Sequence, residues 1–366
     1  MIYRAIGIMS GSSLDGLDIV FAELSESAGK WEYEIRQAET KEFPGELKAK
    51  LQSAGQLSAL EYLRLHSSFG HYIGHQVKLF IEANNLQHQV QVISSHGHTV
   101  FHEPNNRMTA QLGDGAAIAA VTGINVVSDL RAMDLALGGQ GAPIVPLGEK
   151  LFFGDYKLLL NLGGIANISA ANDTDYIAFD VCPANRVLNM LAEEAGKTYD
   201  KDGLLASKGF VRDEVLFKMN QQPYYTRPFP KSLANDFGVE TIYPLLKQAN
   251  LSTSDALRTM VEHICIQLTR STGRLLNTFK ETRPTKMLVT GGGAHNEFLM
   301  QRLQSALSVM GIKLELPSKA VIDYKEALIM ALLGVLRWRE ENTVMHSVTG
   351  AQRSSIGGAV WMGQEA

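Results

Sequence analysis

The sequence predicts an α/β protein built from two domains. Segments with strand patterns alternate with segments of helical periodicity in both halves of the chain, which is typical of the α/β class. The 366 residues are about twice what one hydrophobic core usually serves. Glycine-rich turns between strands occur near the start of each half, at residues 11–16 and 161–164. This repetition favours a duplicated architecture, although the two halves share little residue-level similarity.

Composition excludes several classes of protein. Hydrophobic residues make up 45% of the chain and charged residues 20%, which argues for a globular fold and against disorder. The net charge of −4 provides no basic surface, so we expect no nucleic-acid partner. Two cysteines, Cys182 and Cys265, are too few for a disulfide framework and fit a reducing compartment. No signal-peptide pattern is visible at the start, and the longest weakly polar run, residues 115–127, is too short for a bilayer. We therefore expect a cytoplasmic protein without a membrane partner.

The first half opens with a predicted hairpin. Residues 3–9 alternate apolar and small side chains, the pattern breaks at 10–16, and residues 17–24 resume it. Residues 57–83 carry apolar side chains at helical spacing, with a possible interruption at Gly70.

Two segments follow in the first half. A short apolar strand over residues 90–94 runs into Ser-His-Gly-His at 95–98. The glycine-rich stretch 128–148 predicts a long functional loop near a domain crossing.

The second half repeats the strand–turn–strand layout and then becomes helical. Residues 157–160 lead into the glycine turn 161–164, and 165–169 form the returning strand. The remaining predicted elements are a strand ending at 178–180, a helix over 186–194, an amphipathic helix over 256–279, a strand over 287–289 that enters the glycines 291–293 and a further helix, and a helix over 324–339.

The glycine-rich turns are candidate phosphate-binding sites. Small residues at 11–16 let backbone N–H groups approach phosphate oxygens, and two serines add hydroxyl donors. The turn lacks the Gly-Lys-Ser/Thr ending of a Walker loop, and a strand rather than a helix follows it, unlike a dinucleotide fingerprint. A tight hairpin that needs glycine explains this turn equally well. The turns at 161–164 and 291–293, also at strand ends, favour a nucleotide over that alternative.

Asp180 is a candidate general base. Its strand ends just before residues 183–185 open a helix, and ligands in open α/β sheets lie beyond the carboxyl ends of strands. A carboxylate at that place can accept a proton from a nucleophile. An Asx turn or a helix cap remains the alternative role, since most strand-end aspartates take one.

Five further polar residues are candidates, and each also has a purely structural explanation. Arg131 and Asp134 flank the glycine loop and could clamp a phosphate or sugar, or pair with each other. His96 and His98 have no nearby Cys or carboxylate pattern, so a polar substrate contact or a strand-end hydrogen bond is favoured over a metal site. Glu326 is expected in the first turn of its helix, where the helix dipole favours a negative charge for structural reasons.

Several motifs, in order along nearly the whole chain, resemble those of the anhydro-N-acetylmuramic acid kinase family. The resemblance begins with the ATP-binding signature at residues 7–18. It continues through Ser-His-Gly-His-Thr-Val at 95–100, Gln-Leu-Gly-Asp-Gly at 111–115, Gly-Gly-Gln-Gly-Ala-Pro at 138–143, Asn-Leu-Gly-Gly-Ile-Ala-Asn at 161–167, Gly-Gly-Gly-Ala-His-Asn at 291–296 and Lys-Glu-Ala at 325–327.

The resemblance implies two actin-like, ribonuclease H-like domains around an ATP cleft. The expected first domain comprises residues 1–129 and about 344–366, and the second comprises 130–343. The implied enzyme uses ATP and Mg²⁺ to open 1,6-anhydro-N-acetylmuramic acid and phosphorylate it, which gives N-acetylmuramic acid 6-phosphate and ADP in murein recycling. A homodimer is also plausible from the resemblance.

The resemblance also implies roles for individual residues. Asp180 and Glu326 would be catalytic. Either Asp15 or Asp18 would hold the metal, and Asp15 is favoured. The substrate would contact His96, Thr99, Arg131 and Asp134. The expected ATP-binding residues are Gly11, Ser12, Ser13, Leu14, Asp15, Gly16, Leu17, Asp18, Asn161, Gly163, Gly164, Gly291, Gly292 and Gly293.

The chain departs from the family pattern at three places. Val181-Cys182 and Ala184 stand in a motif expected to read Asp-Thr-Gly-Pro-Gly-Asn, which removes two glycines. His98 stands where glutamine is expected, and Met9 where an acidic residue is common in the superfamily. Two alternative functions stay open: an ordinary hexose or amino-sugar kinase, and an actin-like or chaperone-like ATPase.

Overall fold

The computed structural model describes residues 1–11, 14, 16–171, 176–229, 231–233, 236–280 and 285–363. The chain forms two compact units. Unit 1 comprises Met1–Gly154 and Tyr324–Ala366, and unit 2 comprises Asp155–Asp323. No helix in the described ranges is long and apolar enough to cross a membrane.

Unit 1 contains a six-stranded mixed sheet in the order β13-β7-β4-β1-β2-β3. The first three strands form an antiparallel meander, β4 and β7 run parallel to β1, and β13 closes the edge antiparallel to β7. The strand bounds are β1 Ile2–Ser10, β2 Leu17–Ser27, β3 Lys30–Lys41, β4 Val92–Ser95, β7 Val126–Ser128 and β13 Ala359–Trp361, with a separate hairpin of β5 His98–Glu103 and β6 Met108–Leu112. The carboxyl ends of the parallel strands β1, β4 and β7 therefore meet at one edge of the sheet.

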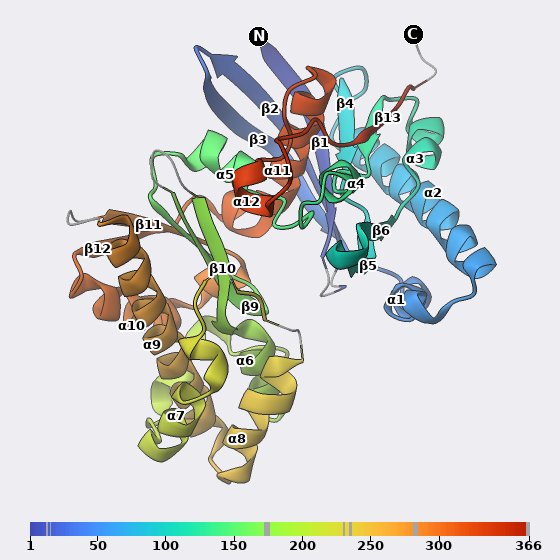
Figure 1. The fold of residues 1–366 in the computed structure, drawn as a ribbon. Coiled ribbons are helices and arrows are strands. Elements are labelled where there is room, and N and C mark those ends of the chain that lie inside the picture. Colours follow the sequence, from blue (N-terminus) through green and yellow to red (C-terminus); the bar gives the residue numbers. More distant parts are fainter. Residues whose placement is uncertain are drawn as a thin grey trace. The chain divides into compact units, whose positions relative to one another are not determined.

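Helices cover both faces of the unit 1 sheet. One face packs against α2 and α3, which lie side by side (Figure 1), and the other packs against α11. Alternate residues of β1 divide between the two cores: Ile6 and Ile8 belong to the first and Ala5 to the second. The helix bounds are α1 Gly45–Gln52, α2 Ala59–Ala83, α3 Gly115–Thr122, α4 Ala132–Ala136, α5 Pro146–Phe153, α11 Lys319–Trp338 and α12 His346–Thr349.

Helix α2 is continuous, so the possible interruption at Gly70 is absent. Ser58 and Glu61 form a capping box at its start. A Cβ at Gly70 would lie 2.5 Å from the carbonyl oxygen of Asp114 and 3.0 Å from the Cβ of Ala117. This glycine therefore serves the close approach of α2 to α3 rather than a break in the helix.

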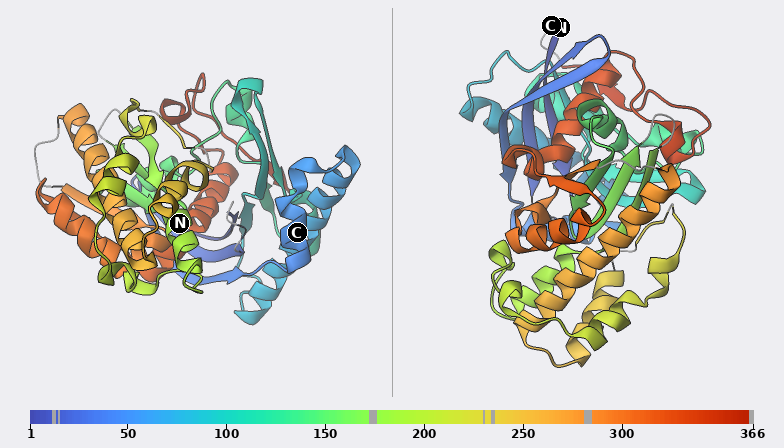
Figure 2. Two further views of the ribbon diagram at one scale, coloured as in Figure 1. Left: turned by 90° about the horizontal axis from the view of Figure 1, so that it is seen from below. Right: turned by 90° about the vertical axis from the view of Figure 1, so that its left-hand side faces the viewer.

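Unit 2 contains a five-stranded sheet in the order β10-β9-β8-β11-β12. Strands β8, β9 and β10 are antiparallel neighbours, whereas β11 and β12 continue parallel to β8. The long helix α9 packs against α6, α7 and α10 (Figure 2). The bounds are β8 Leu158–Leu162, β9 Ile165–Ala171, β10 Tyr176–Pro183, β11 Thr285–Thr290, β12 Ile312–Glu315, α6 Asn185–Glu193, α7 Asp213–Asn220, α8 Tyr243–Gln248, α9 Thr253–Phe279 and α10 Glu297–Ser308.

The two sheets share one topology. In each unit the first three strands form a meander, and the fourth and fifth strands extend the sheet parallel to the first, on its other side. This is the ribonuclease H-like arrangement of actin-like proteins. The predicted α/β class with two actin-like domains is therefore confirmed.

The unit boundaries differ from the predicted ones at 129/130 and 343/344. Residues 130–154 and 324–343 belong to unit 1. The reason is packing, because buried residues of α11 such as Leu328 and Leu332 share a core with Ala5 and Val20 of the first sheet. Helix α11 thereby supplies the second covering layer of that sheet.

Three local expectations also change. The glycine-rich stretch 128–148 includes α4 and the start of α5 rather than one long loop. Helix α11 begins at Lys319 and is broken by non-helical backbone angles at Tyr324, so Glu326 lies in the first turn after that break rather than at the start of the helix. Strand β10 continues past Asp180 to Pro183 through a bulge, so Asp180 does not end its strand.

Candidate active site

A row of polar side chains crosses the unit 2 sheet. Asp180 of β10 pairs with Asn167 of β9, and Asn167 pairs with Asn161 of β8. Residues paired directly across strands point to the same face, with Cβ atoms about 5 Å apart. All three side chains are half-buried. The row therefore places the predicted base and a predicted ATP-binding asparagine on one face. Asn167 was not among the predicted site residues, although it lies in the motif 161–167.

Two predicted glycine turns converge beside this row. Thr290 of β11 pairs with Asn161, and the turn that follows begins at Gly291 with a φ of 82°. A Cβ at Gly291 would lie 2.7 Å from Asn161 Oδ1, and one at Gly293 would lie 2.7 Å from the Cβ of Leu162. Both positions therefore require glycine for the turn to pack against the end of β8. A Cβ at Gly292 would meet nothing closer than 3.8 Å, which leaves its backbone approachable.

The turn between β8 and β9 is joined to the start of α6. The amide N–H groups of Ala184 and Asn185 donate to the carbonyls of Gly164 (2.8 Å) and Gly163 (3.1 Å). The Asn185 side chain donates to the carbonyl of Leu162 at 2.8 Å. These first amides of α6 are thus satisfied by the turn rather than available to an anion. Asn185 is a further residue that the sequence signalled only through its motif.

Asp180 is held by a distant segment of unit 2. Its Oδ2 accepts a hydrogen bond from the Leu233 amide at 2.9 Å, and its own amide donates to the Lys231 carbonyl at 3.2 Å. The Tyr224 hydroxyl donates to the Asp180 carbonyl at 2.6 Å. Burial raises the pKa of the Asp180 carboxyl, opposed by the Leu233 hydrogen bond. A half-buried carboxylate with a raised pKa is suited to accept a proton. The N-cap position of α6 belongs to Ala184, so Asp180 does not cap that helix.

Lys231 is a neighbour that sequence reasoning missed. Its ammonium lies 4.3 Å from the centre of the Tyr224 ring and donates to the Tyr224 carbonyl at 3.2 Å. Burial, reinforced by the charge of Arg274, lowers the pKa of Lys231 to about 8. No local pattern signalled this lysine, because its packing against Tyr224 is a tertiary contact.

In unit 1, predicted substrate residues gather at the carboxyl ends of β1 and β4. The His96 amide donates to the Ile8 carbonyl at 3.1 Å. The Ser10 hydroxyl and His98 Nδ1 lie 3.3 Å apart. Burial lowers the pKa of both His96 and His98, that of His96 to about 3. Both imidazoles are therefore neutral near pH 7, and neither can supply a positive charge to a substrate.

His96 is linked to Arg131 through its other ring nitrogen. Nδ1 of His96 lies 2.9 Å from the Gly97 carbonyl and donates to it, and Nε2 accepts from Nε of Arg131 at 2.9 Å. Nη1 of Arg131 donates to the Gly141 carbonyl at 2.5 Å. Burial lowers the pKa of Arg131 to about 10, while the negative charge of Glu326 acts in the opposite direction. Arg131 therefore interacts both with His96, through a hydrogen bond, and with the negative charge of Glu326.

The environment of Asp134 differs from the one expected for a residue that contacts the substrate. It is 1% exposed, its Oδ2 accepts from the Gly141 amide at 2.7 Å, and its Oδ1 accepts from the Thr349 hydroxyl at 2.7 Å. In the described part of the chain, Arg131 and Asp134 do not pair with each other. Instead, Arg131 bonds to the carbonyl of Gly141 and Asp134 bonds to its amide. This geometry favours a role for Asp134 in shaping the glycine loop, and direct sugar contact stays a prediction.

Thr99 and the first glycine turn complete the predicted set. The Thr99 hydroxyl accepts from the Gln111 side chain at 3.3 Å across the β5–β6 hairpin. Leu14 and Leu17 are buried in the core, so only their backbone atoms could meet a nucleotide. Gly16 packs tightly, since a Cβ there would lie 2.6 Å from Thr40 Cγ2.

Of the two acidic residues at the first turn, Asp18 lies within the described residues and Asp15 does not. Asp18 accepts from the Thr40 hydroxyl at 2.6 Å. The Leu14 amide donates to the Gly11 carbonyl at 3.2 Å, which closes the turn. The predicted roles of Ser12, Ser13 and Asp15 fall on positions outside the described residues.

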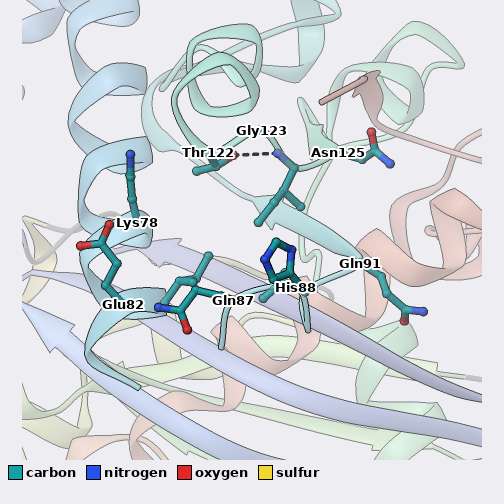
Figure 3. Close-up of a pocket in the computed structure, with 11 residues that line it drawn as sticks. Lys78, Glu82, Gln87, His88, Gln91, Thr122, Gly123 and Asn125 are labelled. Carbon is teal, nitrogen blue, oxygen red and sulfur yellow. Dashed lines mark hydrogen bonds between the residues drawn. The ribbon is translucent and has the colours of Figure 1, made fainter. Parts of the chain in front are cut away.

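A pocket of about 410 Å³ lies elsewhere in unit 1 (Figure 3). Its lining includes Lys78, Glu82, His88 and Asn125, and none of the predicted site residues. The pocket borders the amino ends of β4 and β7, whereas ligands of open α/β sheets bind beyond the carboxyl ends. The pocket is therefore no candidate for the substrate site.

The repeated ribonuclease H-like sheet, with glycine turns at its strand ends, places the protein in the actin-like fold class. The family model for anhydro-N-acetylmuramic acid kinase matches residues 3–363. The chain therefore belongs to the anhydro-N-acetylmuramic acid kinase family. The protein of that name from Aliivibrio fischeri is 35% identical over 98% of this chain and 99% of its own length. The one from Sulfurovum is 32% identical over 98% and 99%.

A solved structure gives a weaker match. The activator of the 2-hydroxyisocaproyl-CoA dehydratase from Clostridium difficile, with bound ADPNP, is 12% identical over 92% of this chain and 96% of that chain. Its TM-score is 0.44, which is too low to bear on the site.

Proposed function

We propose that this protein transfers the terminal phosphate of ATP to 1,6-anhydro-N-acetylmuramic acid while opening its anhydro bridge with water. The products are N-acetylmuramic acid 6-phosphate and ADP, and the reaction serves the recycling of cell-wall murein. The family match over residues 3–363 carries this proposal. Relatives of the same name align over 98% of the chain, so the whole protein rather than one domain is compared.

Asp180 is the proposed general base. It removes a proton from a water molecule as the water oxygen attacks the anomeric carbon, as in an inverting glycosidase. The bond from the anomeric carbon to the bridging oxygen breaks, and that oxygen, now the 6-oxygen, attacks the γ-phosphorus. Phosphoryl transfer then takes the place of the acid that ordinarily protonates the leaving group. The raised pKa of the Asp180 carboxyl supports this role, because it strengthens the base.

The remaining residues position the two substrates in this proposal. The glycine turns that contain Gly163, Gly292 and Gly11 offer backbone donors to the phosphates. Arg131, His96 and Thr99 contact the sugar, and Glu326 helps to orient the water. Asp134 holds the loop that presents Arg131, since both residues bond to Gly141.

Mg²⁺ is the proposed metal, held at the first glycine turn by Asp15. In the described residues, no three His, Cys, Asp or Glu side chains gather as a metal site. Mg²⁺ usually takes one or two carboxylates together with substrate phosphates and water. Asp18, which lies within the described residues at the end of this turn, has a carboxylate, and carboxylate oxygens are the donors that Mg²⁺ prefers. The ion would supply charge neutralisation at the β- and γ-phosphates.

An ordinary sugar kinase is the alternative enzyme, with Asp180 deprotonating a substrate hydroxyl directly. Purified protein incubated with Mg-ATP and anhydro-N-acetylmuramic acid in ¹⁸O-labelled water separates the two. The proposed reaction gives a phosphorylated, hydrated sugar that carries one labelled oxygen on the anomeric carbon. A phosphorylated product that still contains the anhydro bridge, or no phosphorylated sugar, overturns the proposal.

Two further expectations accompany the enzyme. We infer a cytoplasmic location and a homodimer as its working state, both tested by fractionation and by mass in solution. An actin-like or chaperone-like ATPase would instead polymerise, or hydrolyse ATP in response to peptides without phosphorylating a sugar.

A further inference from the structure

A buried ion pair lies next to Glu326 in sequence. Nζ of Lys325 donates to Oε1 of Glu149 at 2.6 Å, and both side chains are 5% exposed. Among the ion pairs of the described residues, it is the only one in which both partners are buried to this extent. Replacing a buried ion pair by apolar residues is often neutral or stabilising, so stability alone is a weak reason for this one.

The pair joins the two segments of unit 1 at which the chain passes between units. Glu149 lies on α5, which ends at Phe153, and unit 1 ends its first segment at Gly154. Lys325 follows directly on Tyr324, where unit 1 resumes. The helical path of α11 is broken at Tyr324, with φ −122° and ψ 16°. Lys325 is therefore the first residue after the break, and its bond to α5 fixes where the helix restarts.

Packing on either side of Glu326 supports the same conclusion. One turn after Lys325, a Cβ at Gly148 would lie 2.6 Å from Ile329 Cγ2, so α5 follows one face of α11. On the other side of Glu326, a Cβ at Gly7 of β1 would lie 1.8 Å from the Ala327 carbonyl oxygen. Residues 325 and 327 are thus both immobilised, which leaves Glu326 little freedom to shift.

We propose that Glu149 and Lys325 are a positioning pair, which holds the restart of α11 so that the Glu326 carboxylate keeps its place near Arg131. The inference rests on the proposed function, in which Glu326 orients the attacking water. Neither member of the pair contacts substrate in this proposal. Both act through Glu326.

The test uses the full chain with Mg-ATP and 1,6-anhydro-N-acetylmuramic acid. The double variant Glu149→Leu/Lys325→Met removes both charges together. We expect it to fold, to keep its KM for both substrates within about threefold, and to lose about 10- to 100-fold in kcat, since small misplacements at a site cost that much. The matched control Ile329→Val weakens the same helix contact without touching the ion pair and is expected to keep kcat within about twofold.

A mutant cycle distinguishes positioning from general structural damage. In a Glu326→Gln background, the double variant is expected to lower kcat by less than about twofold further, because residues that act as a unit are not additive. Losses that multiply in that background, or wild-type kcat in the double variant, overturn the positioning role. If Glu326→Gln itself has wild-type kcat, the proposed role of Glu326 fails, and the positioning role fails with it. Should the double variant not fold, Glu149→Asp, which keeps the charge but shortens the reach, is expected to lower kcat, and Lys325→Arg to retain it better than Lys325→Met.

Discussion

Asn161 and Asp180 lie in one row of the unit 2 sheet, each paired with Asn167 of the strand between them. Two strand spacings separate them, or about 10 Å. The glycine turn at Gly291 packs directly against Asn161. One face of one sheet thus carries the proposed general base at one end of the row and the backbone turns proposed for ATP at the other.

The replacement Asp180→Asn is expected to lower kcat by about two orders of magnitude or more, the usual scale for a lost general base. The amide oxygen can still accept from the Leu233 amide, so the fold and the Kd for ATP should be preserved. The measurement is steady-state kinetics together with ATP binding by calorimetry. Tyr224→Phe serves as the control, since it removes only the bond to the Asp180 carbonyl and should cost less than about tenfold. Near wild-type turnover in Asp180→Asn would exclude Asp180 as the base.

The pH profile of kcat/KM should show an acid limb above the ordinary aspartate pKa of 3.8, because burial raises the pKa of Asp180. The base is active only when ionised, so the rate falls as the pH drops through that pKa. His96 should not contribute, since burial lowers its pKa to about 3 and it stays neutral throughout. The profile of Asp180→Asn provides the comparison, and an unchanged acid limb there would assign it to another group.

The replacement Gly291→Ala should lower the free energy of unfolding by roughly 2–4 kcal/mol, because it combines a positive φ with overpacking. Its φ is 82°, and the added Cβ would lie 2.7 Å from Asn161 Oδ1. Gly196→Ala is the matched control in unit 2, with a φ of 69° and nothing within 4 Å. The control should cost roughly 1–2 kcal/mol through backbone strain alone. Urea unfolding measures both, and equal losses would show that the contact with Asn161 carries no energy.

The replacement Arg131→Lys should raise the KM for the sugar and lower the free energy of unfolding by roughly 1–3 kcal/mol. A lysine cannot donate at once to His96 Nε2 and to the Gly141 carbonyl, as the guanidinium does. The KM for ATP should stay constant in the proposed arrangement. Arg107→Lys, at an exposed position of the same unit, is the control and should change none of these quantities. A wild-type KM for the sugar would remove Arg131 from its binding site.

The sequence predicted the elements whose signals are local. Alternation over residues 3–9, helical spacing over 256–279 and the glycines at 291–293 each appear at the expected place, because side-chain period and backbone freedom depend on neighbouring residues. Ordered motifs along the chain likewise predicted the family, which the comparisons confirm.

What the sequence by itself determined, then, is the class, the family and the set of candidate side chains. Only the tertiary structure decided that the Leu233 amide donates to Asp180, that the Asp134 carboxylate accepts from Gly141 and Thr349, and that α11 belongs to unit 1 from Tyr324 onward. The reason is separation along the chain: Lys325 and Glu149 are 176 residues apart, and no local pattern specifies which distant group a buried charge will meet. That choice is made by the packing of whole helices against a sheet, which also fixes how far each charge is removed from water.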